Sequence, residues 1–176
     1  MRTARDKHQL VVRTLSARAT IGELQFGHQR VRCALGRAGS RVLKREGDGA
    51  SPVGSWPLRE VFFRPGRLAR PRTQLPLRAI ARSDGWCDAP RDRNYNRRIR
   101  HPYPASAEHL WRIDGLYDIV VVLGTNDAPR VHGCGSAIFL HCARDDYAPT
   151  QGCIAVRRSD LVRLLARLRR GTRLRI

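Results

Sequence analysis

A histidine and a cysteine at the ends of two neighbouring apolar runs are the strongest candidates for chemistry in this sequence. The run 137–141 ends in His141, and Gly152 and Cys153 open a second run twelve positions after that histidine. A thiol becomes a strong nucleophile only as the thiolate, and a nearby imidazole is the commonest base that produces it. Gly152 lets the backbone approach a substrate carbonyl, so that the Cys153 N–H can face a developing oxyanion. We therefore predict that Cys153 and His141 form a nucleophile–base pair within hydrogen-bond reach, with some slack if no ligand is bound.

A zinc site is the competing interpretation of the same region. The possible ligands are His132, Cys134, His141, Cys142 and Cys153. No Cys-x-x-Cys knuckle occurs among them, and His132-Gly-Cys134 has an unusual spacing for chelation. Adjacent residues of a strand point to opposite faces, so His141 and Cys142 cannot both bind one ion. The sequence favours the nucleophile–base pair, and we expect neither a metal nor a cofactor.

Short strands must position this pair. Apolar and β-branched residues alternate between turn signals, which is typical of strands that are buried on one face. The predicted strands are 10–15, 21–26, 31–35, 41–44, 58–63, 77–80, 119–123 and 136–141. Because the run 119–123 is apolar throughout, it predicts a central strand that is buried on both faces.

One helix is predicted near the C-terminus, at 159–170. Its N-cap is Ser159, and Gly171 ends it before a predicted edge strand at 172–176. The apolar stripe of this helix comprises Leu161, Leu164, Leu165 and Leu168. By contrast, residues 83–100 are rich in polar and turn-forming types, which predicts a surface lid loop.

The stretch 136–156 resembles the L,D-transpeptidases of the YkuD type. Their signature is an apolar strand ending in His, then a loop, then Ser/Thr-His-Gly-Cys and an apolar residue. Thr150, Gly152 and Ile154 match the positions around Cys153. The resemblance reaches back to the Ser-Pro-x-Gly turn within 44–56. It implies a mainly β (α+β) fold, a β-sandwich of mixed sheets with one C-terminal helix, in a single domain over residues 1–176.

The resemblance also assigns roles to residues. It implies that Cys153 is the nucleophile, that His141 is its base, and that the Cys142 carbonyl orients the imidazole. Gly152 belongs to the backbone that stabilises the oxyanion. Gln151 stands where the family has a second histidine, and Ala155 where Arg or Asn is common.

Four further residues are expected at the substrate. Thr150 and Gln151 precede the nucleophile directly. Tyr95 and Asn96 end an Asp-x-x-Tyr-Asn stretch that occurs in a subset of the family. A loop pinned by its own Asp–Arg pairs is the alternative interpretation of that stretch.

The activity that the resemblance implies is peptidoglycan cross-linking. The thiolate attacks a stem-peptide carbonyl, and the thioester passes to an amine of a neighbouring stem. The bond formed joins two diaminopimelates, or L-alanine to diaminopimelate. Hydrolysis by the same site, an L,D-carboxypeptidase activity, stays open. So does a non-catalytic, Arg-rich protein that binds cell wall or nucleic acid.

The charge of the chain bounds its partners. The formal net charge is +19, and only Lys7 and Lys44 among the basic residues are lysines. So strong an arginine bias implies an anionic or carboxylate-rich partner. The arginines are scattered and no nucleic-acid motif accompanies them, so we expect no nucleic acid. Peptidoglycan stems carry free carboxylates that suit such a surface, and we expect a monomer.

Cysteines and the N-terminus bear on the compartment. Five cysteines leave at least one free thiol, and Cys153 is the natural one. The others, Cys33, Cys87, Cys134 and Cys142, allow three pairings, or they are all unpaired buried thiols. The first twenty residues contain no apolar run typical of a signal peptide. The family implies the periplasm or cell wall, whereas the sequence leaves the export route open.

Overall fold

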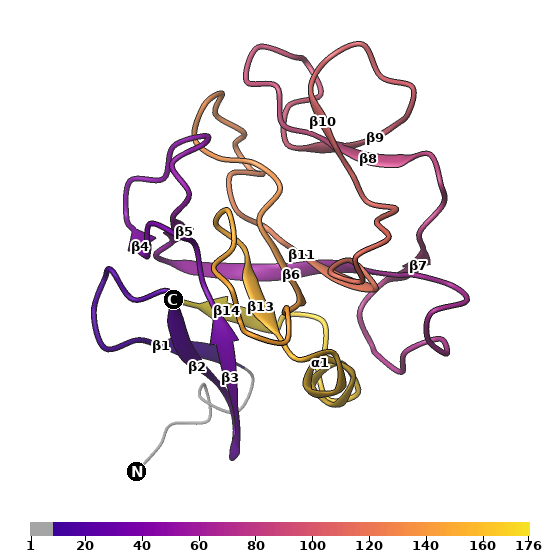
Figure 1. The fold of residues 1–176 in the computed structure, drawn as a ribbon. Helices are drawn as coiled ribbons and strands as arrows, with labels where there is room; N and C mark the ends of the chain where they lie inside the picture. Colours follow the sequence, from indigo (N-terminus) through magenta and orange to yellow (C-terminus); the bar gives the residue numbers. More distant parts are fainter. Residues whose placement is uncertain (1–8) are drawn as a thin grey trace.

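A computed structural model describes residues 9–176 of the chain. It contains short strands and one helix (Figure 1). The strands are β1 (Gln9–Arg13), β2 (Ile21–Phe26), β3 (Gln29–Ala34), β4 (Ser40–Arg41), β5 (Ser51–Pro52), β6 (Ser55–Phe63), β7 (Leu77–Ala79), β8 (Asp84–Cys87), β9 (Arg97–Arg100), β10 (Ala107–His109), β11 (Ile119–Leu123), β12 (Phe139–Cys142), β13 (Ile154–Val156) and β14 (Arg173–Arg175), and the helix is α1 (Arg158–Leu165). The predicted mainly β fold with mixed strand directions and one C-terminal helix is confirmed.

The main sheet closes on itself. Its order is β11-β12-β13-β3-β2-β1-β14-β6-β7, and β6 also pairs with β11. The last strand, β14, lies between β1, to which it is parallel, and β6, to which it is antiparallel. The prediction of an edge strand at 172–176 was therefore wrong. Three residues of Arg-Leu-Arg carry no signal for two partners far away in sequence, so only closure of the sheet reveals this pairing.

One face of the closed sheet carries the larger core, here called the barrel core. It contains alternate residues of the strands together with the apolar stripe of α1. Members from the two kinds of element include Leu10, Leu24, Val121, Leu140, Leu161, Leu164, Leu165 and Leu168. Burial of each such side chain stabilises the fold by about 1.5–3 kcal/mol. The predicted leucine stripe is thus confirmed as the packing face of the helix.

The helix differs from its prediction at both ends. It begins at Arg158 instead of Ser159, the N-cap is Arg157, and no side chain caps it. It ends at Leu165, and the chain continues in turns to Gly171, whose φ is 85°. Leu168 remains fully buried in the barrel core, and its N–H bonds to the carbonyls of Leu164 and Leu165. The apolar stripe therefore runs past the end of the regular helix.

A second core, here called the cap core, covers the other face of β6, β11 and β12. Its members are Phe62, Ile80, Trp86, Leu110, Tyr117, Val120, Val122, Phe139 and Cys153. Strand β11 supplies Val120 and Val122 to this core and Val121 to the barrel core. Its uniformly apolar sequence is explained by burial on both faces, as predicted.

The segment 83–100 is not the lid loop that its composition suggested. It contains β8 and β9, which form an antiparallel three-stranded sheet with β10. In Figure 1 this cap sheet lies above β6 and β11, and α1 lies below them. Trp86 of β8 packs edge-on against Phe139 of β12, with ring centroids 5.3 Å apart. Aromatic burial therefore fixes a segment whose other residues are those of a loop.

Smaller departures concern strand ends and cysteines. The predicted strand 41–44 shrinks to β4, because Val42 and Leu43 are exposed in a bend. All five cysteines are free, and Cys134 alone among them is exposed. Within residues 9–176, no helix has both the length and the apolar character needed to cross a bilayer.

Candidate active site

Parallel pairing of β12 with β13 brings His141 and Cys153 to one face of the sheet. His141 is in register with Ala155, and Cys153 lies two residues before Ala155, on the same face. Cys142 points to the opposite face, into the barrel core. Cys153 lies level with Phe139 at the start of β12, and His141 lies two residues further along that strand, so the two residues share one face of the sheet but not the single rim that the sequence suggested.

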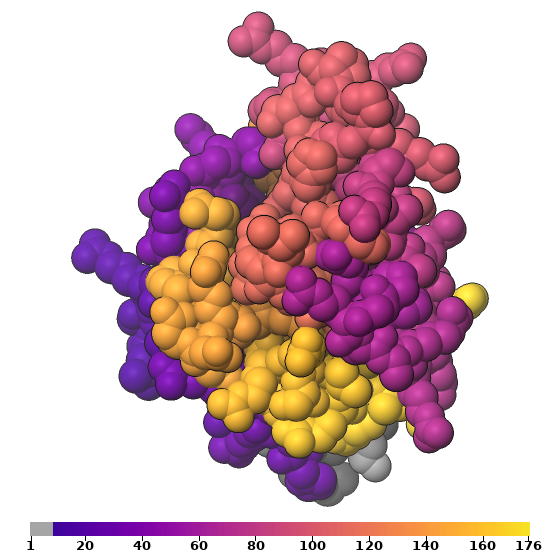
Figure 2. Space-filling model, turned by 45° about the vertical axis from the view of Figure 1, so that its right-hand side comes forward, coloured from indigo at the N-terminus to yellow at the C-terminus, as the bar shows by residue number. Residues whose placement is uncertain are grey.

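Both side chains line one cavity of about 490 Å³. Its wall also includes Tyr117, Thr150 and Gln151. The loop 143–150 forms one side of it and the segment 108–117 another. Figure 2 shows these segments as the orange and salmon surfaces beside each other, with the yellow surface of α1 below. The cavity is large enough to take a short peptide segment.

The thiol of Cys153 is protonated and bonded to the backbone. Sγ donates to the Ala137 carbonyl at 3.3 Å and accepts from the Phe139 N–H at 3.4 Å. Burial raises the pKa of the Cys153 thiol to about 12, and the Glu108 carboxylate adds to the rise. Among residues 9–176, no hydrogen bond joins this thiol to His141. The predicted direct contact is therefore not made, because Sγ has two backbone partners instead.

His141 is a neutral imidazole held in one tautomer. Its Nδ1 lies 2.9 Å from the Cys142 carbonyl, and because a carbonyl only accepts, Nδ1 carries the proton. Nε2 is then the basic nitrogen. Burial lowers the pKa of His141 to about 4, despite the opposing effect of that hydrogen bond. The Tyr117 ring packs edge-on against the imidazole, with centroids 5.2 Å apart.

A tight turn fixes the backbone of the nucleophile. The Thr150 hydroxyl donates to the Cys153 carbonyl at 2.6 Å and accepts from the Gly152 N–H at 3.1 Å. Gly152 has a φ of 133°, and a Cβ there would lie 2.9 Å from the Ala50 carbonyl. A side chain at this position is therefore excluded by both strain and contact. Thr150 holds the turn, and the Gly152 N–H is already engaged.

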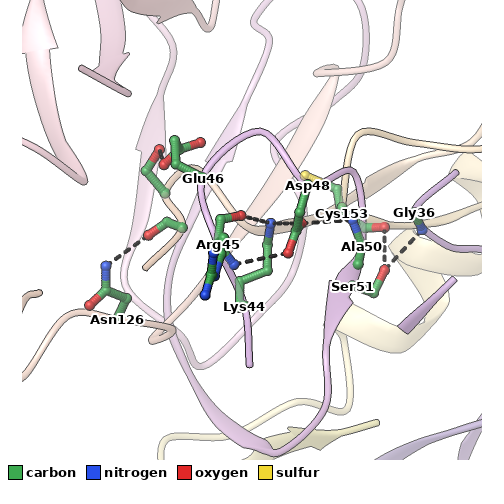
Figure 3. A network of polar contacts seen from close by, with 12 residues as sticks. Gly36, Lys44, Arg45, Glu46, Asp48, Ala50, Ser51, Asn126 and Cys153 are labelled. Carbon is green, nitrogen blue, oxygen red and sulfur yellow. Dashed lines mark hydrogen bonds and ion pairs between the residues drawn. The ribbon is translucent and has the colours of Figure 1, made fainter. Parts of the chain in front are cut away.

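Ser51 supports the same carbonyl from the other side and is a residue that sequence reasoning missed. Its fully buried hydroxyl donates to the Cys153 carbonyl at 3.4 Å and accepts from the Gly36 N–H at 2.9 Å (Figure 3). Ser51 belongs to the Ser-Pro-x-Gly turn noted in the sequence. That motif was the available signal, although it did not indicate a contact across the molecule.

Asn96 is buried and holds the strand that carries the base. Its Oδ1 accepts from the Ala137 N–H at 3.2 Å and from the Trp86 indole, while its Nδ2 donates to the carbonyls of Thr125 and Asn126. Ala137 has a φ of 51°, a region that costs a residue with a Cβ about 1 kcal/mol or more. With 5% of its surface exposed and its amide engaged, Asn96 does not fit the expected direct substrate contact.

Tyr95 is likewise directed inward. It is fully buried, and its hydroxyl donates to Glu46 Oε2 at 2.5 Å, which also accepts from Ser136 at 2.7 Å. Of these three, Glu46 and Ser136 line the cavity and Tyr95 does not. The expected contact between Tyr95 and substrate is therefore replaced by support of the cavity wall.

Gln151 and Lys44 both line the cavity, and the sequence indicated only Gln151 as a site residue. Gln151 is exposed at the rim. Lys44 forms an ion pair with Asp48 and donates to the Arg45 carbonyl at 2.8 Å (Figure 3). Burial acts to raise the pKa of Asp48, but the Lys44 ammonium and two backbone N–H donors outweigh it and lower the pKa. This pair closes the turn 44–50 over the cavity.

Ligands for a metal do not gather in the described part of the chain. No group of three or more His, Cys, Asp or Glu side chains is arranged to hold an ion in residues 9–176. His141 and Cys142 point to opposite faces of β12, as predicted. The cavity instead contains a thiol, a neutral imidazole and backbone N–H donors, which are the groups that nucleophilic catalysis at a carbonyl requires.

Comparison with known protein families gives one match. The family model named YkuD, described as the L,D-transpeptidase catalytic domain, matches residues 10–176. Neither the curated proteins nor the solved structures gave a match.

Proposed function

Because the chain belongs to the YkuD family of L,D-transpeptidase catalytic domains, we propose that it is a cysteine-dependent L,D-transpeptidase acting on peptidoglycan stem peptides. The observation that carries this proposal is the placement of Cys153 and His141 on one face of two parallel strands, in one cavity. The Cys153 thiolate is the nucleophile, and His141 is the base.

Acylation begins with a proton transfer. At rest both groups are neutral, since burial disfavours the charged form of each. Sγ must leave the Ala137 carbonyl and turn toward Nε2 of His141, which takes its proton. The thiolate then attacks the stem carbonyl and forms a C–S bond. Substrate binding in the cavity must favour this rotation of the Cys153 side chain.

The oxyanion formed in that attack needs donors. The Gly152 N–H is bonded to Thr150, so the Cys153 N–H is the backbone donor that we assign to the oxyanion. One such donor contributes about 3 kcal/mol to transition-state stabilisation. Thr150 and Ser51 act as positioning residues, because they hold the Cys153 carbonyl on one side of the donor's peptide unit, and Thr150 also holds the Gly152 N–H on the other.

The thioester then meets one of two acceptors. The amine that leaves takes the proton from His141, and an incoming amine or water resolves the acyl-enzyme. An amine of a neighbouring stem gives a cross-link, between two diaminopimelates or from L-alanine to diaminopimelate, depending on the donor bond. Water gives an L,D-carboxypeptidase activity at the same site.

The charge of the chain supports an anionic substrate at the cell wall. A net charge of +19 attracts the free carboxylates of stem peptides over a Debye length of about 10 Å at 0.1 M salt. The family is associated with the cell wall, and we place this chain in the periplasm or wall on that ground.

Mass spectrometry after incubation with a carbapenem tests the proposal. We expect one adduct, on Cys153, in the unmodified protein and none in Cys153→Ala. Cys134→Ser is the matched control: it removes the exposed thiol and should leave the adduct in place. An adduct confined to Cys134, or none at all, contradicts a cysteine-dependent L,D-transpeptidase.

A further inference from the structure

The cavity differs in charge from the rest of the chain. Three carboxylates line it, from Glu46, Asp88 and Glu108. Three cations line it as well, from Lys44, Arg112 and Arg144. Lys44 and Arg112 are paired with Asp48 and Asp114, neither of which lines the cavity. In a chain with a net charge of +19, this cavity therefore has as many carboxylates as cations, and two of those cations are shared with carboxylates outside it.

Glu108 is the cavity carboxylate whose charge acts on the Cys153 thiol. Its Oε1 accepts from the Tyr117 hydroxyl at 2.6 Å. Arg112 forms a longer ion pair with the same oxygen, at 3.8 Å, which is beyond hydrogen-bond distance. Oε2 has no hydrogen-bond partner among residues 9–176. Glu108 therefore has one oxygen, Oε2, without a hydrogen bond. Its other oxygen is bonded to Tyr117, whose ring packs against His141.

Electrostatics agree with this placement. Burial raises the pKa of Glu108, against the opposing effects of Tyr117 and Arg112. The Glu108 charge also contributes to the raised pKa of the Cys153 thiol, which places the carboxylate within electrostatic reach of the nucleophile. A partly buried carboxylate such as Glu108 that is not fully paired gains from a bound cation.

We propose that Glu108 binds the primary amine of the acceptor as an ammonium ion beside the Cys153 thioester. This inference rests on the proposed function, because only an acyl-enzyme that is resolved by an amine needs such a site. It assigns to Glu108 the choice between aminolysis and hydrolysis. An ammonium ion gains a charge-assisted hydrogen bond to Oε2, which water does not match.

The transfer step balances with this assignment. The ammonium gives one proton to Glu108 Oε2, and the amine lone pair forms the new C–N bond at the thioester carbonyl. His141 takes the second N–H proton as the amide forms. The C–S bond breaks, and the thiolate takes that proton from His141. Glu108 then returns its proton to water, and both Cys153 and His141 are neutral again.

Product partition in Glu108→Gln tests this role. Glutamine keeps an oxygen that accepts from Tyr117 and removes the charge. The donor is a tetrapeptide stem, the acceptor a tripeptide stem with a free diaminopimelate amine, and products are separated by liquid chromatography and mass spectrometry. We expect the acceptor KM to rise about ten- to hundredfold, in line with the loss of a hydrogen bond to a charged group. Hydrolysed donor should become the main product, and Glu108→Asp should restore part of the cross-linking.

Glu23→Gln is the matched control, because Glu23 lies on the surface in an exposed pair with Arg30. It should leave the partition unchanged. If Glu108→Gln takes up carbapenem on Cys153 and keeps the acceptor KM of the unmodified protein, Glu108 is not the amine site, although the proposed function stands. If the unmodified protein takes up no carbapenem, the proposed function itself fails.

A second measurement uses the unmodified protein and so does not depend on the folding of any variant. Two non-reactive acceptors are compared as competitors of cross-linking: the tripeptide stem with its side-chain amine dimethylated, which stays cationic with one N–H, and the same stem acetylated, which is neutral. We expect the dimethylated stem to compete at least tenfold more strongly, since it keeps the charge-assisted contact. Equal competition by the two overturns the proposal.

Discussion

The barrel core and the cap core share some of their strands but differ in the kinds of side chain that they contain. Strands β11 and β12 contribute to both. The barrel core is mainly aliphatic and includes the leucines of α1. The cap core contains Tyr117, Trp86 and Cys153, and the His141 imidazole packs against it.

Cys33 and Cys153 show that burial alone does not distinguish one thiol from another. Cys33 in the barrel core and Cys153 in the cap core are both buried, and burial raises the pKa of each to about 12. Only Cys153 opens onto a cavity that it shares with a neutral imidazole. We therefore propose that the neighbours of Cys153, and not its burial, distinguish it from the structural Cys33.

Removing the thiol should give the largest effect of all. We expect Cys153→Ala to abolish stem cross-linking and carbapenem uptake, because no other group supplies the nucleophile. The midpoint of thermal unfolding should shift little, since only one sulfur atom is lost. Cys33→Ala is the matched control and should keep the activity. Retained cross-linking in Cys153→Ala would show that the cap core is not the reacting side.

A barrel-core substitution should lower stability and leave the reactivity of Cys153 in place. Leu164→Ala removes a fully buried side chain of α1 and should lower the free energy of unfolding by about 2–5 kcal/mol. In buffer without denaturant, where the variant is still folded, it should take up carbapenem on Cys153. Urea titration measures the first effect and mass spectrometry the second. A loss below about 0.5 kcal/mol would place α1 outside the cooperative core.

Asn96→Ala should affect both stability and chemistry. It leaves the Ala137 N–H and two carbonyls without their partners, at a cost of about 1–3 kcal/mol for a buried unsatisfied group. Because Ala137 holds the Cys153 thiol, carbapenem uptake should slow by roughly tenfold, a loss of about 1.4 kcal/mol. Asn94→Ala, in the same segment but bonded to Tyr103, should leave that rate unchanged. Equal rates for the two variants would refute the positioning role.

The pH profile should report the buried imidazole. His141 acts as a base only when it is neutral, so the acidic limb of carbapenem acylation should have one apparent pKa near 4. Between the ordinary histidine pKa of about 6.5 and this value, the unfolded chain binds a proton that the folded chain does not. The free energy of unfolding should therefore fall as pH drops from about 6.5 to 4. A rate midpoint near 6.5 would mean that the imidazole is solvated when it reacts.

Gln151→His should have the smallest effect. Gln151 is exposed at the cavity rim, so stability should change by no more than about 0.5 kcal/mol. The substitution introduces a second imidazole and should add an ionisation near pH 6.5 to the acidic limb, since an exposed histidine titrates at about this value. A single ionisation in the variant would show that residue 151 does not contact the reacting groups.

Much of the fold and the central pair of the site could be predicted from the sequence. The strands over 21–26 and 119–123 and the leucine stripe of α1 follow from local periodicity, which tertiary contacts did not override. The strand that carries His141 and the strand that begins after Cys153 follow from apolar runs and a glycine. These features depend on neighbours in sequence, so the sequence contains them directly.

The remaining features depend on residues brought together from afar, and only the tertiary structure decided them. Closure of the sheet set β14 between β1 and β6, and aromatic burial turned the expected lid into the cap sheet. Burial also directed Asn96 away from the substrate and onto Ala137, and it brought Glu108 against Tyr117. A polar side chain carries no local signal of its distant partner, because the partner is chosen by which groups remain unsatisfied once the cores have packed.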